Sequence, residues 1–198
     1  MTTRTSHIML VLSAFLAGLV IFFAVLLFAT GQFRNGGPGA SAIGGPFKLI
    51  DQDGKPITDQ DMKGEPLLVF FGYTHCPDVC PTTLFEMSEV LRAMGPDAAR
   101  VHALYITVDP ERDTPPVMKD YLSSFDPNLR GATGDAKAID AAEKAYHVYA
   151  KKVPTGNGDY SMDHTALVYL MDKQGRFVAP FNLKRRPEDS AADLKKYL

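Results

Sequence analysis

The sequence predicts a mixed α/β domain that follows a single hydrophobic membrane segment. Three observations lead to this prediction: an uncharged apolar run over residues 8–30, a glycine-rich stretch over residues 31–45, and alternating strand-like and helix-like segments over residues 46–198. The last region has about 150 residues, the common size of one domain. No internal repeat or second boundary divides it.

The apolar run extends from Ile8 to Thr30 without a charged residue. A helix of this length, at ~1.5 Å rise per residue, spans a hydrocarbon core of ~30 Å. A secretory signal has a shorter apolar region, about 7–15 residues, followed by a small-residue cleavage site. We find no convincing cleavage site, so we expect an uncleaved transmembrane anchor behind a tail of residues 1–7; a cleaved signal peptide is the alternative.

The flanks of this run indicate its orientation and the compartment. Arg4 and Arg34 lie on opposite sides, so the positive-inside signal is nearly balanced. The short tail and its free amine favour an N-terminus inside and a C-terminal domain outside the cytoplasm. Because no Arg- and Ser-rich presequence is present, we expect a bacterial inner membrane, with the domain in the periplasm. Residues 31–45 are expected to form a flexible linker.

Charge excludes one class of partner. The 198 residues carry a formal net charge of −2 and no strongly charged run. Binding to nucleic acid calls for a basic face, so we expect no nucleic-acid partner.

The first half of the domain predicts strands leading to one long helix. Residues 47–50 alternate and residues 53–54 form a turn, which predicts an N-terminal hairpin with residues 56–57. Residues 66–71 form an unbroken apolar run, as in a central strand covered on both faces. Thr83 and Glu86 have the spacing of a capping box, and the apolar positions behind them predict a helix that starts close to Cys80.

The remaining elements alternate in type. We predict a strand over 101–108, a helix over 114–125, a helix over 135–146, a short strand over 147–152, a loop over 153–162, a strand over 165–171, a turn over 172–175, a strand over 176–181 and a helix over 187–197. Strands alternating with helices, closed by a hairpin and a helix, predict an α/β sandwich with a mixed sheet in a thioredoxin-like order.

The chain has two cysteines, Cys76 and Cys80, and they follow the buried strand. A spacing of four places both sulfurs on one face if the segment is helical. They can then bind a soft metal ion or close into a disulfide. A purely structural disulfide is a weak use of this spacing, because a loop this short stabilises a fold little. In open α/β sheets, sites gather beyond the carboxyl ends of strands, where this pair lies.

His164 is the candidate for a third ligand. It opens the strand expected to run beside the one that leads into the cysteines, so its start would fold over the cysteine loop. Two thiolates and one imidazole suit Cu(I). Zn²⁺ would need a fourth ligand, for which Asp78, Asp163 or a water remains. Any of these metals requires reduced thiols, so a disulfide would abolish binding.

Three motifs in order resemble the Sco/SenC family of membrane-anchored copper chaperones for cytochrome c oxidase assembly. They are Gly72-Tyr73-Thr74-His75-Cys76-Pro77-Asp78-Val79-Cys80-Pro81, Val108-Asp109-Pro110-Glu111-Arg112-Asp113-Thr114-Pro115, and Asp163-His164-Thr165 before an apolar strand. The similarity covers the anchor, the linker and the domain. Three ordered motifs are specific, whereas an isolated CxxxC pair would not be.

The resemblance implies a thioredoxin-like fold and a copper ion, Cu(I) or Cu(II), bound by Cys76, Cys80 and His164. It implies delivery of that copper to the binuclear centre of cytochrome c oxidase subunit II, so the protein is a chaperone and not an enzyme. A periplasmic copper chaperone or a thiol reductant is a further implied partner. On the same basis Asp78 lies near the ligands, whereas Asp109, Asp113 and Pro115 hold a loop and a helix start.

Two other functions remain as alternatives. The first is a periplasmic thiol–disulfide oxidoreductase that keeps target cysteines reduced. Redox catalysts of the thioredoxin class usually carry CxxC after a Trp; this chain has CxxxC, no Trp, and Asp163-His164 where a Pro would be expected. The second is a peroxidase related to peroxiredoxins, against which the pairing of two cysteines in one loop argues.

Overall fold

The computed structural model describes residues 14–23, 25, 43–156 and 158–198. The chain separates into two units, Met1–Ala40 and Ser41–Leu198. In the first unit, residues 14–23 and 25 are helical. Among the described residues, no helix combines the length and apolar character needed to cross a membrane. The rest of the predicted 8–30 span, and residues 31–42 of the predicted linker, lie outside the described residues.

The second unit is built on a seven-stranded mixed sheet, in the order β2-β1-β5-β4-β3-β8-β9. Neighbouring strands β3, β4 and β5 are parallel, and every other pairing in this sheet is antiparallel. The strands are β1 (Lys48–Asp51), β2 (Pro56–Thr58), β3 (Leu67–Gly72), β4 (His102–Thr107), β5 (Leu129–Thr133), β8 (Val168–Met171) and β9 (Phe177–Pro180). The predicted N-terminal hairpin, β1–β2, is confirmed.

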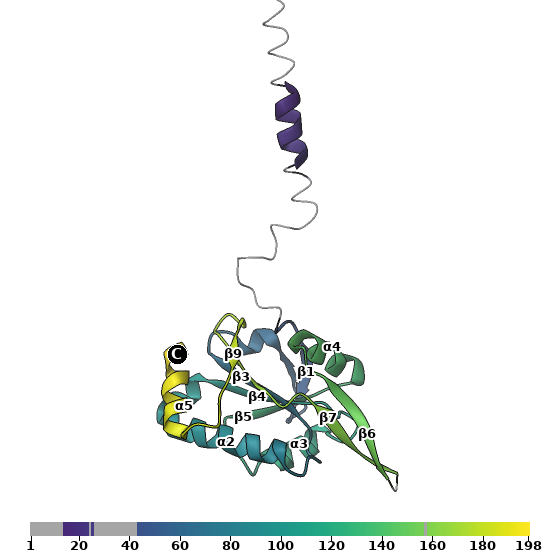
Figure 1. Cartoon of the computed structure of the whole chain (residues 1–198), viewed down its shortest axis with the longest axis vertical. Helices are drawn as coiled ribbons and strands as arrows, with labels where there is room; N and C mark the ends of the chain where they lie inside the picture. Colours follow the sequence, from purple (N-terminus) through teal and green to yellow (C-terminus); the bar gives the residue numbers. More distant parts are fainter. Residues whose placement is uncertain (1–13, 24, 26–42, 157) are drawn as a thin grey trace, which may run out of the picture. The chain divides into compact units, whose positions relative to one another are not determined.

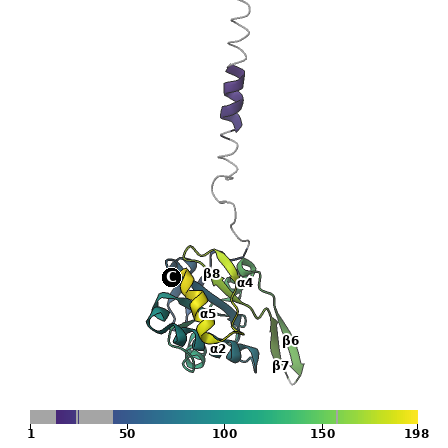
Figure 2. The same ribbon diagram turned by 60° about the vertical axis from the view of Figure 1, so that its left-hand side comes forward.

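Helices cover both faces of this sheet. Figure 1 shows α2, α3 and α5 along one side and α4 on the opposite side. Figure 2 shows α5 beside α2, and these two helices are in contact. The helices are α2 (Val79–Met94), α3 (Pro115–Leu122), α4 (Ala136–Tyr146) and α5 (Pro187–Leu194), with the 3-10 turns η1 (Asp59–Met62), η2 (Gly95–Arg100) and η3 (Lys195–Tyr197). This is the predicted thioredoxin-like α/β sandwich.

The core lies around the central strand β3. All six of its residues are buried, as the unbroken apolar run predicted. Phe70, Phe71 and, on the neighbouring strand β4, Tyr105 are among the largest side chains with no appreciable exposure. The end of β3 is therefore held rigidly, and the loop that follows it starts from a fixed point.

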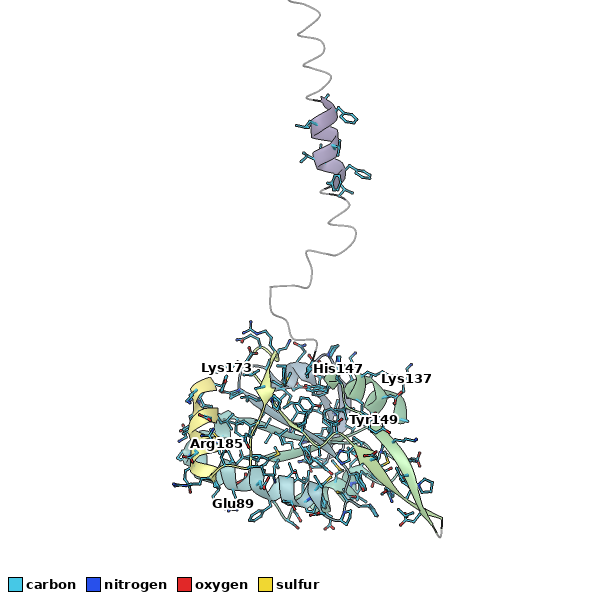
Figure 3. The ribbon with its side chains drawn as sticks, viewed as in Figure 1. Glu89, Lys137, His147, Tyr149, Lys173 and Arg185 are labelled. Atoms are coloured by element: carbon cyan, nitrogen blue, oxygen red, sulfur yellow. The ribbon has the colours of Figure 1, made fainter. Side chains whose placement is uncertain are left out.

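Helix α4 confirms the predicted helix, including its end at Tyr146, and corrects the strand that was predicted to begin at His147. The Asp135 carboxylate accepts a hydrogen bond from the backbone N–H of Ala138 at 2.7 Å, a normal N-cap. The helix is followed by His147, whose φ of 55° is left-handed and whose N–H donates to the Glu143 and Lys144 carbonyls. His147 is thus a C-cap and does not begin a strand. Figure 3 shows His147 and Tyr149 on the segment that leads out of α4.

Helix α2 starts earlier than its capping-box pattern suggested. Its N-cap is Asp78, so Thr83 and Glu86 lie inside the helix and the capping-box interpretation is wrong. Pro81 is accommodated as the third helical residue, because the first N–H groups of a helix have no intrahelical partner. As a result Cys80 belongs to the first turn of the helix. Helix α3 has its N-cap at the predicted Thr114 but ends at Leu122 instead of Phe125.

The largest error concerns residues 147–164. The predicted short strand and loop are instead a hairpin of β6 (Ala150–Gly156) and β7 (Asp159–His164), a separate two-stranded sheet. Its tip projects away from the main sheet in Figures 1 and 2. Strand β6 is largely exposed and β7 is only partly buried, so neither shows the apolar alternation that reveals a strand. Strand β8 accordingly begins at Val168 instead of residue 165.

Strand β5 has no counterpart in the predicted elements. Its sequence contains Arg130 and Gly131, which interrupt the apolar pattern. A Cβ on Gly131 would lie 2.6 Å from Leu122 Cδ1 and 2.9 Å from Met118 Cε. The glycine is therefore needed so that helix α3 can pack directly on the strand.

Candidate dithiol–imidazole site

The two cysteines lie at the junction between β3 and α2. Cys76 is in the loop after β3, and its N–H donates to the Tyr73 carbonyl at 3.2 Å. Cys80 is the second residue of α2, and its N–H lies 3.4 Å from Cys76 Sγ in hydrogen-bond geometry. Both thiols are free; Cys80 is completely buried and Cys76 is half-buried. Cys76 is therefore the sulfur that solvent or a partner meets first.

His164 approaches the buried cysteine from the hairpin. It is the last residue of β7, and its Nε2 lies 3.6 Å from Cys80 Sγ. The ring contacts Tyr73 edge-on, with centroids 5.8 Å apart, and Phe70, with centroids 6.4 Å apart. The sequence argument placed His164 at the start of the strand beside β3; three residues separate it from that strand, β8, but the predicted proximity to Cys80 is found.

The second ring nitrogen fixes the tautomer of His164. Its Nδ1 lies 3.0 Å from the Thr165 carbonyl oxygen. A carbonyl only accepts, so Nδ1 carries a proton, and in the neutral ring Nε2 then presents a lone pair toward Cys80 Sγ. Histidines that ligate metals commonly have their other ring nitrogen held in this way.

Cys80 links the other two residues of the site. Cys76 contacts the Cys80 backbone, and Cys80 Sγ contacts His164. Among the described residues, no group of three or more His, Cys, Asp or Glu side chains is gathered closely enough to hold a metal ion. The structure thus brings the predicted residues into one place without closing them around a common centre.

Cys80 is poised as a neutral thiol. Burial, reinforced by the adjacent Cys76, raises the pKa of Cys80 well above its ordinary value, and the backbone of Tyr73 opposes this. A ligand that bonds to this sulfur must therefore displace its proton.

A buried carboxylate holds the cysteine loop in place. Asp113, completely buried, accepts hydrogen bonds from the Thr74 N–H at 3.0 Å, the Thr74 hydroxyl at 2.6 Å and the Thr107 hydroxyl at 2.6 Å. Burial nevertheless raises the pKa of Asp113 above its ordinary value. The expectation that Asp113 supports a loop agrees with these contacts.

A second network attaches the hairpin, and sequence reasoning missed it. The buried Asp109 carboxylate pairs with the Arg112 guanidinium and accepts a 2.8 Å hydrogen bond from the Tyr160 hydroxyl. Arg112 also donates to the Tyr160 carbonyl at 3.0 Å and lies over the Tyr160 ring, 3.8 Å from its centroid. The sequence carries no signal for this contact, because Tyr160 lies in a strand that the pattern did not reveal.

The other residues considered from sequence stay outside the cluster. His75 is exposed, and its Nδ1 lies 3.1 Å from the Thr74 hydroxyl. Asp78 is the exposed N-cap of α2 and makes no side-chain capping bond, and Asp163 is exposed on β7. We find none of the three turned into a contact with the thiols.

Fold and site together define a class: a thioredoxin-like protein that presents two free thiols and an imidazole at the carboxyl end of its central strand. The SCO1/SenC family model matches residues 35–198. An SCO2-like protein of Rickettsia felis is 37% identical over 155 residues, which cover 77% of this chain and 76% of the relative. The chain therefore belongs to the SCO1/SenC family.

Solved structures agree with this assignment. The copper-bound structure of Bradyrhizobium japonicum ScoI is 69% identical, with a TM-score of 0.78 over 79% of this chain and 99% of that chain. The structure of BsSco, described as a member of the Sco family of cytochrome c oxidase assembly proteins that has a disulfide switch, is 26% identical, with a TM-score of 0.61 over 77% of this chain and 91% of that chain.

Proposed function

We propose that this protein is a copper-binding chaperone that delivers copper to the binuclear copper centre of cytochrome c oxidase subunit II. The observation that carries the proposal is the 3.6 Å approach of His164 Nε2 to Cys80 Sγ, beside a second free thiol. The copper-bound relative at 69% identity supports it. In this role copper is cargo that is bound and released, so the protein performs no catalytic turnover.

The ligand set of the proposal is Cys76, Cys80 and His164. Thiolate sulfur and imidazole nitrogen are the donors that copper prefers in its reduced state, and Cu(II) also accepts this set when an oxygen is added. Binding replaces the protons of both thiols and uses the lone pair that the tautomer of His164 already presents. A modest movement of the three side chains toward a common centre completes the site.

Because the two sulfurs differ in solvent exposure, we assign them different roles in copper transfer. Cys76 is half-buried and reachable, whereas Cys80 and the copper-facing nitrogen of His164 lie behind it. A recipient would therefore exchange ligands with Cys76 first. A periplasmic copper chaperone would load the same position by the reverse exchange.

The placement in the cell follows the sequence. We propose a tail over residues 1–7, a membrane anchor over 8–30, a linker over 31–45 and the copper-binding domain over 46–198. The anchor is single-pass in a bacterial inner membrane, with the domain in the periplasm, where the oxidase centre is assembled. The bacterial relatives from Rickettsia and Bradyrhizobium are consistent with this setting.

A second function is favoured by the unequal exposure of the thiols. In a thiol–disulfide exchange, the Cys76 thiolate attacks a target disulfide and the sulfur of Cys80 then displaces the target thiol. The target gains two electrons and two protons, and Cys76 and Cys80 are left as a disulfide that a periplasmic thiol reductant must reduce. The disulfide switch described for BsSco supports this as an accessory role.

The test is an anaerobic Cu(I) titration of the reduced full-length chain in detergent, in competition with a chromophoric chelator. We expect one tightly bound ion, a loss of about tenfold or more in affinity for His164→Ala, and a larger loss for Cys76→Ser. His75→Ala is the matched control, because that imidazole is exposed and outside the cluster. A wild-type protein that binds no better than Cys76→Ser would overturn the copper proposal.

The same variants separate the two functions. If copper binding depends on the imidazole and thiol exchange does not, His164→Ala loses copper affinity but still reduces a disulfide substrate. Cys76→Ser loses both. If the protein exchanges thiols but does not bind copper, the reductase function is the one that stands and the copper function is refuted.

A further inference from the structure

In the part of the chain that the structure describes, two buried hydroxyl groups near the thiols have no hydrogen-bond partner. Tyr105, on β4, is completely buried, and its hydroxyl oxygen is unpaired among the described residues. The hydroxyl of Tyr121, on α3, is buried and unpaired as well, and the two rings lie 6.1 Å apart. A buried polar group without a partner is costly, so such a group in a native protein calls for an explanation.

Gly72 shows where the Tyr105 hydroxyl lies. A Cβ at this last position of β3 would be 2.8 Å from Cys80 Sγ, 2.8 Å from Tyr105 Cε2 and 3.0 Å from the Tyr105 hydroxyl oxygen. The sulfur and the hydroxyl therefore border the same space, above one residue that has no side chain. Any other residue at position 72 would occupy the space they share.

The sulfur of Cys80 receives no hydrogen bond from the neutral ring of His164. The His164 nitrogen that faces Cys80 bears a lone pair and no proton, so it cannot donate to the sulfur. The Tyr105 hydroxyl has a proton and no competing acceptor.

We propose that Tyr105 is a positioning residue that donates a hydrogen bond to the Cys80 sulfur when that sulfur is a metal-bound thiolate. The hydroxyl is held ready by its ring contacts with Phe70 and Tyr121, and the absence of a side chain at Gly72 keeps the path open. The proposal rests on the proposed function, since it concerns the copper-loaded form.

The consequence is both energetic and electronic. A hydrogen bond to a charged acceptor is stronger than one to a neutral acceptor, so Tyr105 favours the loaded state over the empty one. By withdrawing electron density from the sulfur, it also raises the energy of sulfur-to-copper charge transfer in the Cu(II) form. Loss of the hydroxyl should therefore lower affinity and shift that absorption band to longer wavelength.

The experiment compares Tyr105→Phe with wild type in the reduced full-length chain. We expect a loss of roughly tenfold or more in Cu(I) affinity, from the chelator competition, and a red shift of the Cu(II)–thiolate band. Tyr146→Phe is the matched control: it removes the hydroxyl of another buried tyrosine, on α4, whose ring packs on Phe71. It should leave both readouts unchanged.

The possible outcomes are separable. If wild type binds copper and Tyr105→Phe retains its affinity and band energy, the role of Tyr105 is overturned while the chaperone proposal stands. If wild type itself binds no copper, both proposals fail. Band energy reports only loaded molecules, so partial misfolding would reduce intensity without moving the band.

An isosteric replacement covers the case in which Tyr105→Phe does not fold. Replacing Tyr105 by 3-fluorotyrosine keeps the ring and makes the hydroxyl a stronger donor. We expect a shift of the band to shorter wavelength; an unmoved band would contradict the hydrogen bond.

Discussion

The imidazole of His164 meets the sulfur of Cys80 at 3.6 Å although the two residues are 84 positions apart in the chain. Cys80 is set by the start of a core helix, whereas His164 is set by the end of an exposed hairpin. The site therefore depends on how α2 and the β6–β7 hairpin are held together.

Copper affinity should rise with pH. Burial raises the pKa of Cys80, so this thiol is protonated at neutral pH and its proton must leave when copper binds. Each proton released makes the apparent affinity rise by up to about tenfold per pH unit. Chelator competition at about pH 6, 7 and 8 measures the slope, after correction for protonation of the chelator. A flat profile would show that both sulfurs are already deprotonated in the empty protein.

The contact of Arg112 with the hairpin should contribute to both stability and copper binding. Arg112→Ala leaves the Asp109 carboxylate buried without its cation and removes the hydrogen bond to the Tyr160 carbonyl. We expect a loss of roughly 3 kcal/mol in the free energy of unfolding, from urea denaturation, with weaker Cu(I) binding because His164 is less well placed.

The matched control for this change is Lys152→Ala. The Lys152 ammonium also lies over the Tyr160 ring, 4.5 Å from its centroid, but it is exposed and pairs with Glu111 at the surface. Because an exposed ion pair contributes little, this substitution should cost much less stability than Arg112→Ala. Equal effects of the two substitutions would refute a special role of the buried pair.

A methyl group at position 72 should reduce both the stability of the domain and its affinity for copper. In Gly72→Ala the new Cβ would lie 2.8 Å from Cys80 Sγ and from Tyr105 Cε2, closer than packing allows. We expect a destabilisation of about 1–3 kcal/mol and reduced copper affinity. Gly134→Ala, whose Cβ would meet Leu49 Cδ2 at 3.3 Å, should be much better tolerated. Thermal unfolding of both variants measures the difference in stability. Equal stabilities would contradict the prediction and would mean that the end of β3 shifts to make room for the methyl group.

A titration on α4 should make the domain less stable as pH rises. Burial, with help from the neighbouring Asp140, raises the pKa of Glu143 to about 7. Its ordinary pKa is about 4.3, so the neutral form favours the folded state fully below that pH, and the benefit is lost as pH rises toward 7.

Glu143→Gln removes this dependence. Because the side chain is partly exposed, we expect the variant to gain only about 1 kcal/mol over wild type between about pH 5 and pH 8. Urea denaturation at the two pH values measures the gain. Parallel behaviour of wild type and variant would mean that solvent screens the carboxyl group.

The elements that were predicted correctly share strong local signals. Strand β3 was recognisable because six consecutive residues are buried on both faces, and α4 because Asp135 caps it. The β6–β7 hairpin gives no such signal: its strands are polar, and Arg112, far away in the sequence, attaches it. Its existence depends on tertiary contacts that a local pattern does not contain.

The site shows the same division. The proximity of His164 to Cys80 could be predicted from residue chemistry, although His164 ends β7 and does not open the strand beside β3. Tyr105 could not be identified in this way, because a tyrosine in an apolar strand has the pattern of a core residue. What distinguishes it is an unpaired hydroxyl facing a sulfur across a glycine, which only the folded arrangement reveals.

The separate sheet of β6 and β7 has a consequence for a protein that must give up what it carries. Under the proposed function, the sulfurs belong to the main body of the fold and the nitrogen belongs to the β6–β7 hairpin, which is attached through Asp109, Arg112 and Tyr160. Binding and release of the copper ion then depend on different parts of the molecule. A partner that pulls on the hairpin would loosen the cargo while the two sulfurs and the core behind them stay in place.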